Sequence, residues 1–210
     1  MIFTPEHVQM IVEGRKTQTR RLVKPGEYTW MSIPGAVTGK PPNLHSPPKL
    51  NYTEVCRENG SVRFAIEKTY AVQPGRGLPT AKVKDGRVWM YAPRFALADG
   101  PSFDFSLEEW HKRSADWHPL RIRITEIRRE KLMNISEDDA SDEGVICPEC
   151  GGTGWMLGPP SDPWSGPSEH PCDCNLVKEY AKVWDRINKR KGTRWQDNPL
   201  VWVLTFEAVR

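Results

Sequence analysis

The sequence has no long hydrophobic run and few cysteines. No segment approaches the ~20 consecutive apolar residues that a membrane-spanning helix requires, and the first residues lack the charged and then apolar pattern of a signal peptide. Hydrophobic residues make up only 38% of the 210 positions, which is still enough for one core. We therefore expect a cytoplasmic protein without a membrane partner, built as one domain with insertions or with a small satellite.

The chain also lacks a large excess of positive or negative charge. The net charge of +3 is compatible with a nucleic-acid partner but does not indicate one. Charge is unevenly placed, however. Residues 136–149 hold six acids and no Lys or Arg, and residues 121–131 hold five Lys or Arg against two acids. Glu143 falls at the end of an expected short helix, where the helix dipole disfavours a carboxylate, so we consider it a candidate functional residue.

Four of the five cysteines lie close together late in the chain. Cys147 and Cys150 form a C-x2-C pair, and 21 residues separate them from a C-x-C pair, Cys172 and Cys174. In a chain without an export signal, this spacing favours a metal over disulfides. It predicts a closed, structural Zn²⁺ site with four thiolates. Free cysteines on a loop are the alternative, and His170 is a possible substitute ligand.

Proline and glycine are concentrated in a few stretches of the chain, which indicates that these stretches are insertions. We expect a barrel over residues 1–145 that carries loop insertions at about 25–60 and 79–119. A cysteine-rich, zinc-binding insertion over 146–175 follows, and residues 176–210 supply a C-terminal helix and the last strand.

Hydrophobic periodicity predicts helices near residues 5–13, 137–143 and 176–190 and strands near 62–66, 120–125 and 200–206. In the strand over 120–125, the apolar residues alternate with Arg121 and Arg123, which we expect to point outward. Strands mixed with few, short helices indicate an α+β fold. We expect a small, mostly antiparallel and partly closed β-barrel with flanking helices.

Two segments could contact anions. Residues 14–21 carry four cations and two threonines after an expected helix end, and residues 70–77 form a glycine-containing turn with Arg76. Each is either a solvated turn or a phosphate contact, and the spacing does not decide between them. If residues 14–21 are extended, their side chains alternate between two faces, with Lys16, Gln18 and Arg20 on one and Thr17, Thr19 and Arg21 on the other.

These segments resemble a known family. The sequence G-R-K-T-Q-T-R-R at 14–21 is similar to the G-x-K-T-x-T-x-R signature of ASCH domains, which are PUA-like barrels related to RNA-binding modules. Residues 127–145 resemble the second motif of that family, and residues 70–77 and 195–203 resemble its phage and prophage branch. The resemblance covers roughly half of the chain, and the paired motifs make it specific.

The resemblance implies a protein that acts on RNA, DNA or a modified nucleoside in the cytoplasm of a phage host. One bacterial branch hydrolyses N4-acetylcytidine to cytidine and acetate with a lysine, a threonine and a glutamate. Carried over to this chain, these residues are Lys16, Thr19 and Glu143. The lysine would activate the threonine hydroxyl as a nucleophile. Lys16 and Thr19 point apart in a regular strand, so they can converge only at a turn or a bulge.

A non-catalytic RNA- or DNA-binding module, or a ribonuclease, is the alternative function, and the insertions could bind a protein partner. In either case we expect cations to hold phosphate groups. The candidate binding residues are Arg15, Arg20, Arg21, Arg76, Arg121 and Arg123.

Overall fold

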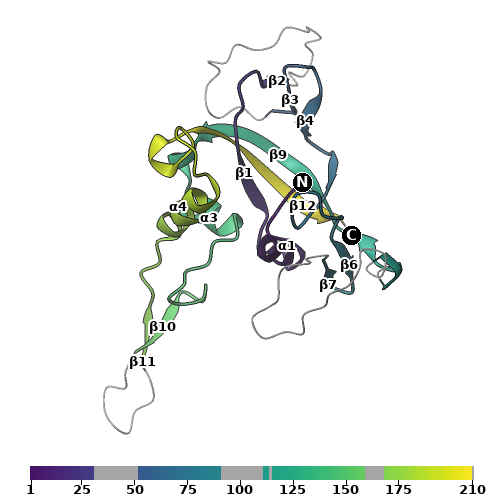
Figure 1. Cartoon of the computed structure of the whole chain (residues 1–210). Helices are drawn as coiled ribbons and strands as arrows, with labels where there is room; N and C mark the ends of the chain where they lie inside the picture. The colour runs from purple at the N-terminus through teal and green to yellow at the C-terminus, as the bar shows by residue number, and fades with distance from the viewer. Residues whose placement is uncertain (31–51, 91–110, 114, 159–167, 210) are drawn as a thin grey trace.

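The computed structural model describes residues 1–30, 52–90, 111–113, 115–158 and 168–209 (Figure 1). The protein is a mixed α+β structure with mostly antiparallel sheets and few helices. Within these ranges, none of the helices has the length and apolar character needed to cross a membrane.

A four-stranded antiparallel sheet, in the order β1-β12-β9-β5, forms the centre of the molecule. Its strands are β1 (Gln18–Leu22), β12 (Leu200–Val209), β9 (Arg121–Lys131) and β5 (Thr69–Ala71). The two long strands, β9 and β12, therefore lie in the middle, and the shorter strands lie at the edges. The first motif of the sequence is placed on an edge strand, next to the last strand of the chain.

The remaining described strands form three small sheets. They are β2 (Tyr28–Trp30), β3 (Glu54–Cys56) and β4 (Val62–Ala65), then β6 (Lys82–Lys84), β7 (Arg87–Trp89) and β8 (His118–Pro119), and finally the hairpin β10 (Trp155–Gly158) and β11 (Ser168–Pro171). The expected barrel is corrected here, because among the described residues four open sheets form and none closes. The edge strands β1 and β5 do not pair with each other.

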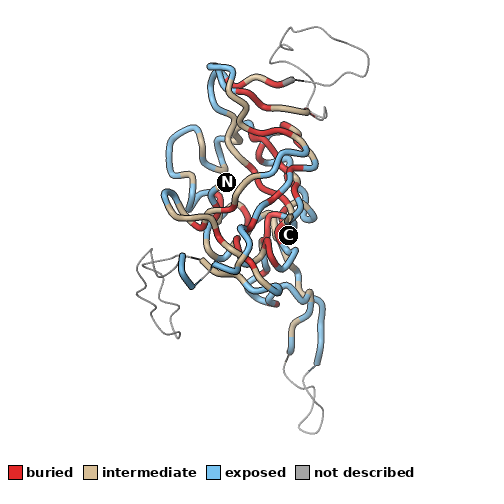
Figure 2. Tube along the Cα trace, turned by 90° about the vertical axis from the view of Figure 1, so that its right-hand side faces the viewer, coloured by how far each residue is buried: buried red, intermediate tan, exposed pale blue. Residues whose placement is uncertain are grey.

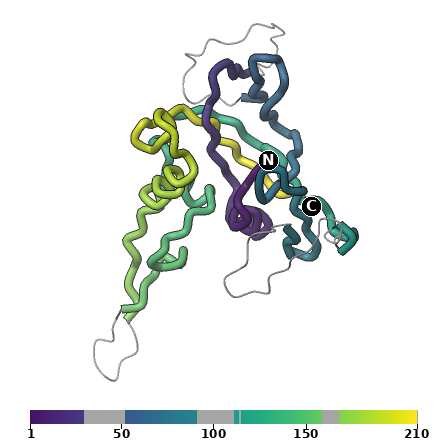
Figure 3. Tube along the Cα trace, viewed as in Figure 1, coloured from purple at the N-terminus to yellow at the C-terminus, as the bar shows by residue number. Residues whose placement is uncertain are grey.

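The expected loop insertions also need correction. Parts of residues 25–60 and 79–119 form short strands, because three-residue segments such as β3 and β6 can pair locally without a long hydrophobic period. Residues 31–51 and 91–110 of these insertions lie outside the described residues. In the cysteine-rich insertion, β10 and β11 pair with each other and extend away from the body of the molecule (Figure 3).

The three predicted helices are present. Helix α1 (Pro5–Val12) begins at the N-cap Thr4, and α3 (Glu137–Asp142) begins with a capping box in which Ser136 and Asp139 bond to each other's backbone N–H. Helix α4 (Leu176–Ile187) is the longest. Short 3-10 helices, η1 (Leu132–Asn134) and η2 (Trp195–Asp197), follow β9 and precede β12.

Helix α4 starts against α3. The Glu137 carboxylate accepts hydrogen bonds from the backbone N–H groups of Leu176, at 2.7 Å, and Val177, at 3.4 Å. The first residue of α3 thus satisfies free donors at the start of α4, in addition to the N-cap Asn175. The two ends of the cysteine-rich insertion are therefore held close together.

The central sheet is covered on both faces. One face packs against α3 and α4 through Leu132, Ile135, Ala140, Tyr180, Trp184, Val201 and Val203. The other face packs beneath the sheet of β2, β3 and β4 through Tyr52, Val55, Phe64, Ile124, Ile127, Trp202 and Leu204. Figure 2 shows the buried residues gathered in this body, whereas β11 is exposed along its whole length.

A bulge in β9 determines which side chains face the helices. Ile122 and Ile124 are fully buried, and the flanking Arg121 and Arg123 are exposed, as the alternation predicts. The register against β12 then shifts between Thr205 and Phe206, so that Thr125 is an extra residue. Beyond this bulge the alternation changes phase and Ile127 becomes the buried apolar residue.

Candidate functional site

The segment between α1 and β1 carries Lys16 into the molecule. Helix α1 ends at Val12, and beyond its C-cap Glu13 the backbone N–H groups of Arg15 and Lys16 donate to the Met10 carbonyl at 2.9 and 3.2 Å. Thr17 then donates its N–H to the Asp142 carbonyl of α3 at 2.9 Å. These bonds fix the backbone on both sides of Lys16 and place it against the C-terminal end of α3.

Lys16 and Glu143 form a buried ion pair although 127 positions separate them. The Lys16 ammonium donates to Glu143 Oε2 at 2.9 Å and to the Glu143 carbonyl at 2.5 Å. The two side chains are only 1% and 5% exposed. Burial lowers the pKa of Lys16 below its ordinary value of 10.5, and the attraction of Glu143 opposes this shift only in part.

Gly144 allows this close approach. It has a φ of +83°, and a Cβ atom there would lie 2.9 Å from Met10 Sδ and 3.4 Å from Lys16 Cβ. A larger residue would therefore be strained at this φ and would press on the side chains of Met10 and Lys16. The glycine that ends α3 sets how near Glu143 comes to Lys16.

Arg20 is the centre of a wider set of contacts. Its side chain is completely buried. Nη1 donates to Gln18 Oε1 at 2.7 Å and to Glu143 Oε1 at 3.3 Å, and Nη2 donates to Glu130 Oε1 at 2.8 Å and to Asp139 Oδ2 at 3.0 Å. One guanidinium group therefore joins β1 to β9 and α3.

Arg128 completes this cluster from β9. It donates to Asp139 Oδ1 at 2.6 Å and lies 3.5 Å from Glu130 Oε2. Because of the bulge at Thr125, Arg128 and Glu130 face α3, on the same side of the sheet as Arg20. We call this cluster the charge network; its three cations and three anions balance, and its members are Lys16, Gln18, Arg20, Arg128, Glu130, Asp139 and Glu143.

One donor of the charge network has no hydrogen-bond partner, and an aromatic ring lies beside the network. Arg20 Nε is buried and has no hydrogen-bond partner in the described structure, so one donor is left over. The ring of Tyr180 lies 5.9 Å from the Arg20 guanidinium carbon. Burial, together with the nearby Glu143 carboxylate, raises the pKa of Tyr180 well above its ordinary value, so its phenol stays protonated at neutral pH.

A hollow of about 350 Å³ lies beside Lys16. The end of α1, the residues Lys16 and Thr17, and the Phe206–Ala208 part of β12 line it. This volume lies near the lower limit for small-molecule sites. Lys16 is the one member of the charge network among these lining residues.

Thr19 is not brought to this pair. β1 pairs with β12 in unbroken register, with Thr19 opposite Leu204 and Arg20 opposite Val203. Neighbouring side chains of a strand point to opposite faces, so Thr19 lies on the face away from Arg20 and Glu143. No hydrogen bond of the described residues joins its hydroxyl to Lys16 or Glu143. The alternation predicted for residues 14–21 is thus present, and the structure has no turn or bulge that overrides it.

The six arginines predicted to bind nucleic acid are scattered. Arg20 belongs to the charge network. Arg21 lies on the opposite face, donates to the Ile2 carbonyl at 2.8 Å and packs over the ring of Phe3. Neither side chain extends into solvent as an open phosphate contact would.

The other four arginines of this prediction lie at the surface. Arg15 is paired with Glu13, and Arg123 Nε donates to Glu207 at 2.7 Å. Arg76 and Arg121 are exposed. Arg121 and Arg123 share one face of β9, but the structure does not bring all six together into one cationic surface.

The sequence analysis did not assign Arg128, Glu130 and Asp139 to the site. A signal was present, because the apolar spacing in β9 changes from two residues to three between Ile124 and Ile127. Such a change indicates a bulge. It would have placed Arg128 and Glu130 on the face of Arg20.

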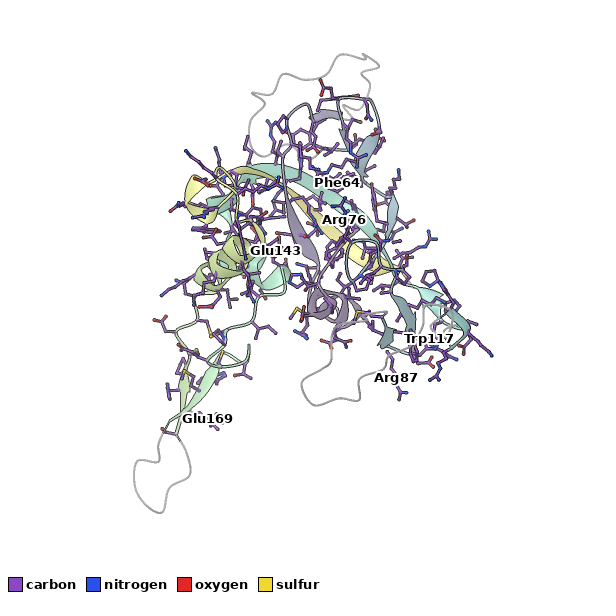
Figure 4. The ribbon with its side chains drawn as sticks, viewed as in Figure 1. Phe64, Arg76, Arg87, Trp117, Glu143 and Glu169 are labelled. Atoms are coloured by element: carbon purple, nitrogen blue, oxygen red, sulfur yellow. The ribbon has the colours of Figure 1, made fainter. Side chains whose placement is uncertain are left out.

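The four clustered cysteines form the second candidate site. Cys147 Sγ and Cys172 Sγ are 3.8 Å apart, and Cys150 Sγ and Cys174 Sγ are 3.4 Å apart. All four sulfur atoms lie within 4.8 Å of one another, and none forms a disulfide. In Figure 4 the hairpin residue Glu169 lies well away from Glu143, so the hairpin of the cysteine-rich insertion extends away from the charge network.

The environment of Cys150 suits a thiolate. Burial acts to raise the pKa of Cys150, but hydrogen bonds from the Gly154 N–H, the Cys174 thiol and the Gly152 N–H outweigh it and lower the pKa to about 6. Gly152 and Gly154 have φ angles of +88° and +76°, which turn their N–H groups toward the sulfur. Four convergent sulfur atoms with such donors could hold a metal ion.

Comparison of the chain with protein-family models, with curated proteins and with solved structures finds no match. A function for this chain must therefore be argued from its own residues.

The network predicts that Asp139 stabilises the fold. Burial acts to raise its pKa, but the Gln18 hydrogen bond and the charges of Arg20 and Arg128 outweigh this effect, and the pKa lies below 3.8. We expect Asp139→Asn to lower the free energy of unfolding by about 2 kcal/mol at pH 7. Asp138→Asn, on the exposed side of the same helix, is the matched control and should change it little.

The pH dependence separates this interaction from a general effect of the substitution. A carboxyl group with a lowered pKa stabilises the fold above pH 3.8, and its contribution is lost as the pH falls through the lower, folded pKa. The difference between wild type and Asp139→Asn in urea titrations should therefore shrink in acid. A difference that is constant from pH 7 to pH 3 would contradict the assignment.

Proposed function

We propose that this protein is an ASCH-like protein of PUA-like fold that acts on nucleic acid or on modified nucleosides, and that it deacylates N4-acetylcytidine-like bases. The observation that supports this most directly is the buried contact of Lys16 with Glu143 at 2.9 Å. These two residues come from the two separate motifs that carry the resemblance. Convergence of distant titratable groups with a shifted pKa is typical of a catalytic site.

The hydrogen bonds of Lys16 suit a general base. A neutral amine has two N–H groups and one lone pair, and Lys16 donates two hydrogen bonds, both to Glu143. The lone pair is then free to accept a proton from a hydroxyl group. Burial lowers the pKa of Lys16, so this neutral form is present at a lower pH than for an exposed lysine.

Water is the attacking group in this proposal, because Thr19 lies on the other face of β1. Lys16 takes a proton from a water molecule in the hollow as the water oxygen bonds to the acetyl carbon. The bond between that carbon and N4 then breaks, Lys16 or Glu143 returns the proton to the leaving amine, and cytidine and acetate result. The free N–H of Arg20 is a donor beside the pair, although a ligand must displace neighbours to reach it.

We further propose that the metal of the cysteine cluster is Zn²⁺. For Zn–S bonds of about 2.3 Å, a tetrahedron requires sulfur atoms about 3.8 Å apart, and two of the sulfur pairs are at 3.8 and 3.4 Å. Cys147, Cys150, Cys172 and Cys174 would occupy every position. Such a site has no place for a catalytic water, so the metal has a structural role.

Replacement of Lys16 by methionine should abolish most turnover of N4-acetylcytidine. We expect a loss of about a hundredfold to ten-thousandfold, which is the usual contribution of a general base. The exposed Lys131→Met is the control for loss of a positive charge. Turnover is followed by chromatography of released cytidine, and thermal melting shows whether each variant is folded.

The wild-type pH profile tests the same role. Because Lys16 must lose its proton to act as a base, turnover should rise with pH, with a midpoint below the ordinary lysine value of 10.5. If folded wild type releases no cytidine or acetate at any pH but binds RNA or DNA, the non-catalytic binding module is the correct function.

The position of Thr19 gives a test that distinguishes water from threonine as the attacking group. Thr19→Val removes the hydroxyl and should retain most of the turnover, because this side chain lies on the face away from Glu143. Loss of a true nucleophile costs several orders of magnitude. A comparable loss in a folded Thr19→Val variant would show that Thr19 attacks and that β1 rearranges when substrate binds.

The purified protein should contain about one Zn²⁺ per chain by elemental analysis. Cys150→Ser should lose the metal, because three thiolates bind Zn²⁺ more weakly than four. Cys56→Ala is the control, since Cys56 is buried in β3 outside the cluster. Iron in place of zinc would contradict the identity of the metal, and the absence of any metal would contradict the site.

A further inference from the structure

A basic turn follows α4 and belongs to neither of the sites above. Residues 186–194 contain five Lys or Arg and no Asp or Glu. All five are exposed, and none forms an ion pair with another described residue. We call this segment the basic turn; its cations are Arg186, Lys189, Arg190, Lys191 and Arg194.

Several exposed cations elsewhere in the described chain are neutralised by neighbours. Pairs join Arg15 to Glu13, Lys84 to Asp116, Arg123 to Glu207, and Lys182 to Glu179. In contrast, the two acids nearest to the basic turn in sequence accept hydrogen bonds from backbone N–H groups. Asp185 accepts from the Trp195 N–H at 2.6 Å, and Asp197 accepts from the Arg194 N–H at 3.0 Å. The basic turn is therefore a local excess of positive charge.

The backbone of the basic turn is held in one conformation. Trp184 is buried in α4, and its indole N–H donates to the Thr193 carbonyl at 2.8 Å. The Thr193 hydroxyl donates to the Arg190 carbonyl at 2.8 Å, and the N–H of Asn188 donates to the Trp184 carbonyl at 2.8 Å. Cations on a fixed backbone lose less conformational entropy when they bind than cations on a flexible tail.

We propose that the basic turn binds the phosphate backbone of a nucleic acid. A single strand carries one negative charge about every 3.4 Å, so closely spaced cations can contact several phosphates at once. The basic turn is a surface separate from the Lys16–Glu143 pair, and the inference does not depend on deacylation.

Two other partners fit the basic turn less well. A membrane-surface helix inserts a wide apolar face, but the apolar face of α4, with Tyr180 and Trp184, is buried against the central sheet. Ile187 is the one strongly exposed apolar residue there. A protein partner usually contacts an apolar interface centre that is poor in lysine, and the basic turn offers no such centre.

The test uses fluorescence anisotropy with labelled single strands of about 20 nucleotides, as RNA and as DNA of the same sequence. The triple variant Lys189→Gln, Arg190→Gln and Lys191→Gln should bind at least about tenfold more weakly than wild type at moderate salt. The slope of log affinity against log salt should fall by about 2, since each phosphate contact contributes about 0.7 for a single strand. RNA and DNA should be affected alike if phosphates are the ligand.

The matched control is the triple variant Lys24→Gln, Lys68→Gln and Lys131→Gln, which removes the same charge from exposed positions elsewhere. It should keep wild-type affinity. The variant Lys189→Arg and Lys191→Arg keeps the charge and should also bind. Equal losses in both glutamine triples, or no binding of either strand by wild type, would overturn the proposal. So would tighter binding to phosphatidylserine vesicles or to polyglutamate than to RNA and DNA.

Deacylation is measured in the same variants. The glutamine triple in the basic turn should hydrolyse free N4-acetylcytidine at the wild-type rate, because none of its residues touches Lys16 or Glu143. Weaker strand binding with unchanged turnover supports the basic turn as a separate surface. If wild type binds strands through the basic turn but has no turnover, the proposed reaction fails and this inference stands.

Discussion

A fully buried guanidinium group is the constraint around which this structure is arranged. Arg20 cannot lose its charge, so removing it from water requires carboxylates close to its nitrogen atoms. Glu130, Asp139 and Glu143 supply them, and they come from β9, α3 and the end of α3. The edge strand, the central strand and the helix are thus held in one relative position, and disturbance of any one leaves a charge unpaired.

The same constraint positions the candidate catalytic pair. Glu143 uses one carboxylate oxygen for Arg20 and the other for Lys16. Its orientation is therefore determined before any ligand arrives, which is the pre-organisation that catalysis requires. Burial of the Lys16 ammonium costs stability and lowers the pKa of Lys16. The Glu143 carboxylate opposes this shift, but it is shared with Arg20, whose positive charge lowers the pKa further. The stability cost and the lowered pKa of Lys16 thus have one physical origin.

Much of the local structure could be predicted from the sequence. The helices near residues 5–13 and 137–143 and the alternation of Ile122 and Ile124 depend on neighbouring residues, and the structure confirms them. The paired positions of Lys16 and Glu143 were implied only by a family resemblance. The open sheets and the short strands depend on contacts between distant segments, so they do not follow from local periodicity.

The contact of Glu137 with the start of α4 has a consequence for how this chain could vary. The two ends of the cysteine-rich insertion are joined by an interaction that belongs to the body, not to the insertion. A longer or shorter insertion would therefore need to close the same gap, and doubling a loop costs only about 0.6 kcal/mol in closure entropy. Evolution or design could therefore replace the cysteine-rich insertion by a different module at this junction without moving the helices that cover the sheet.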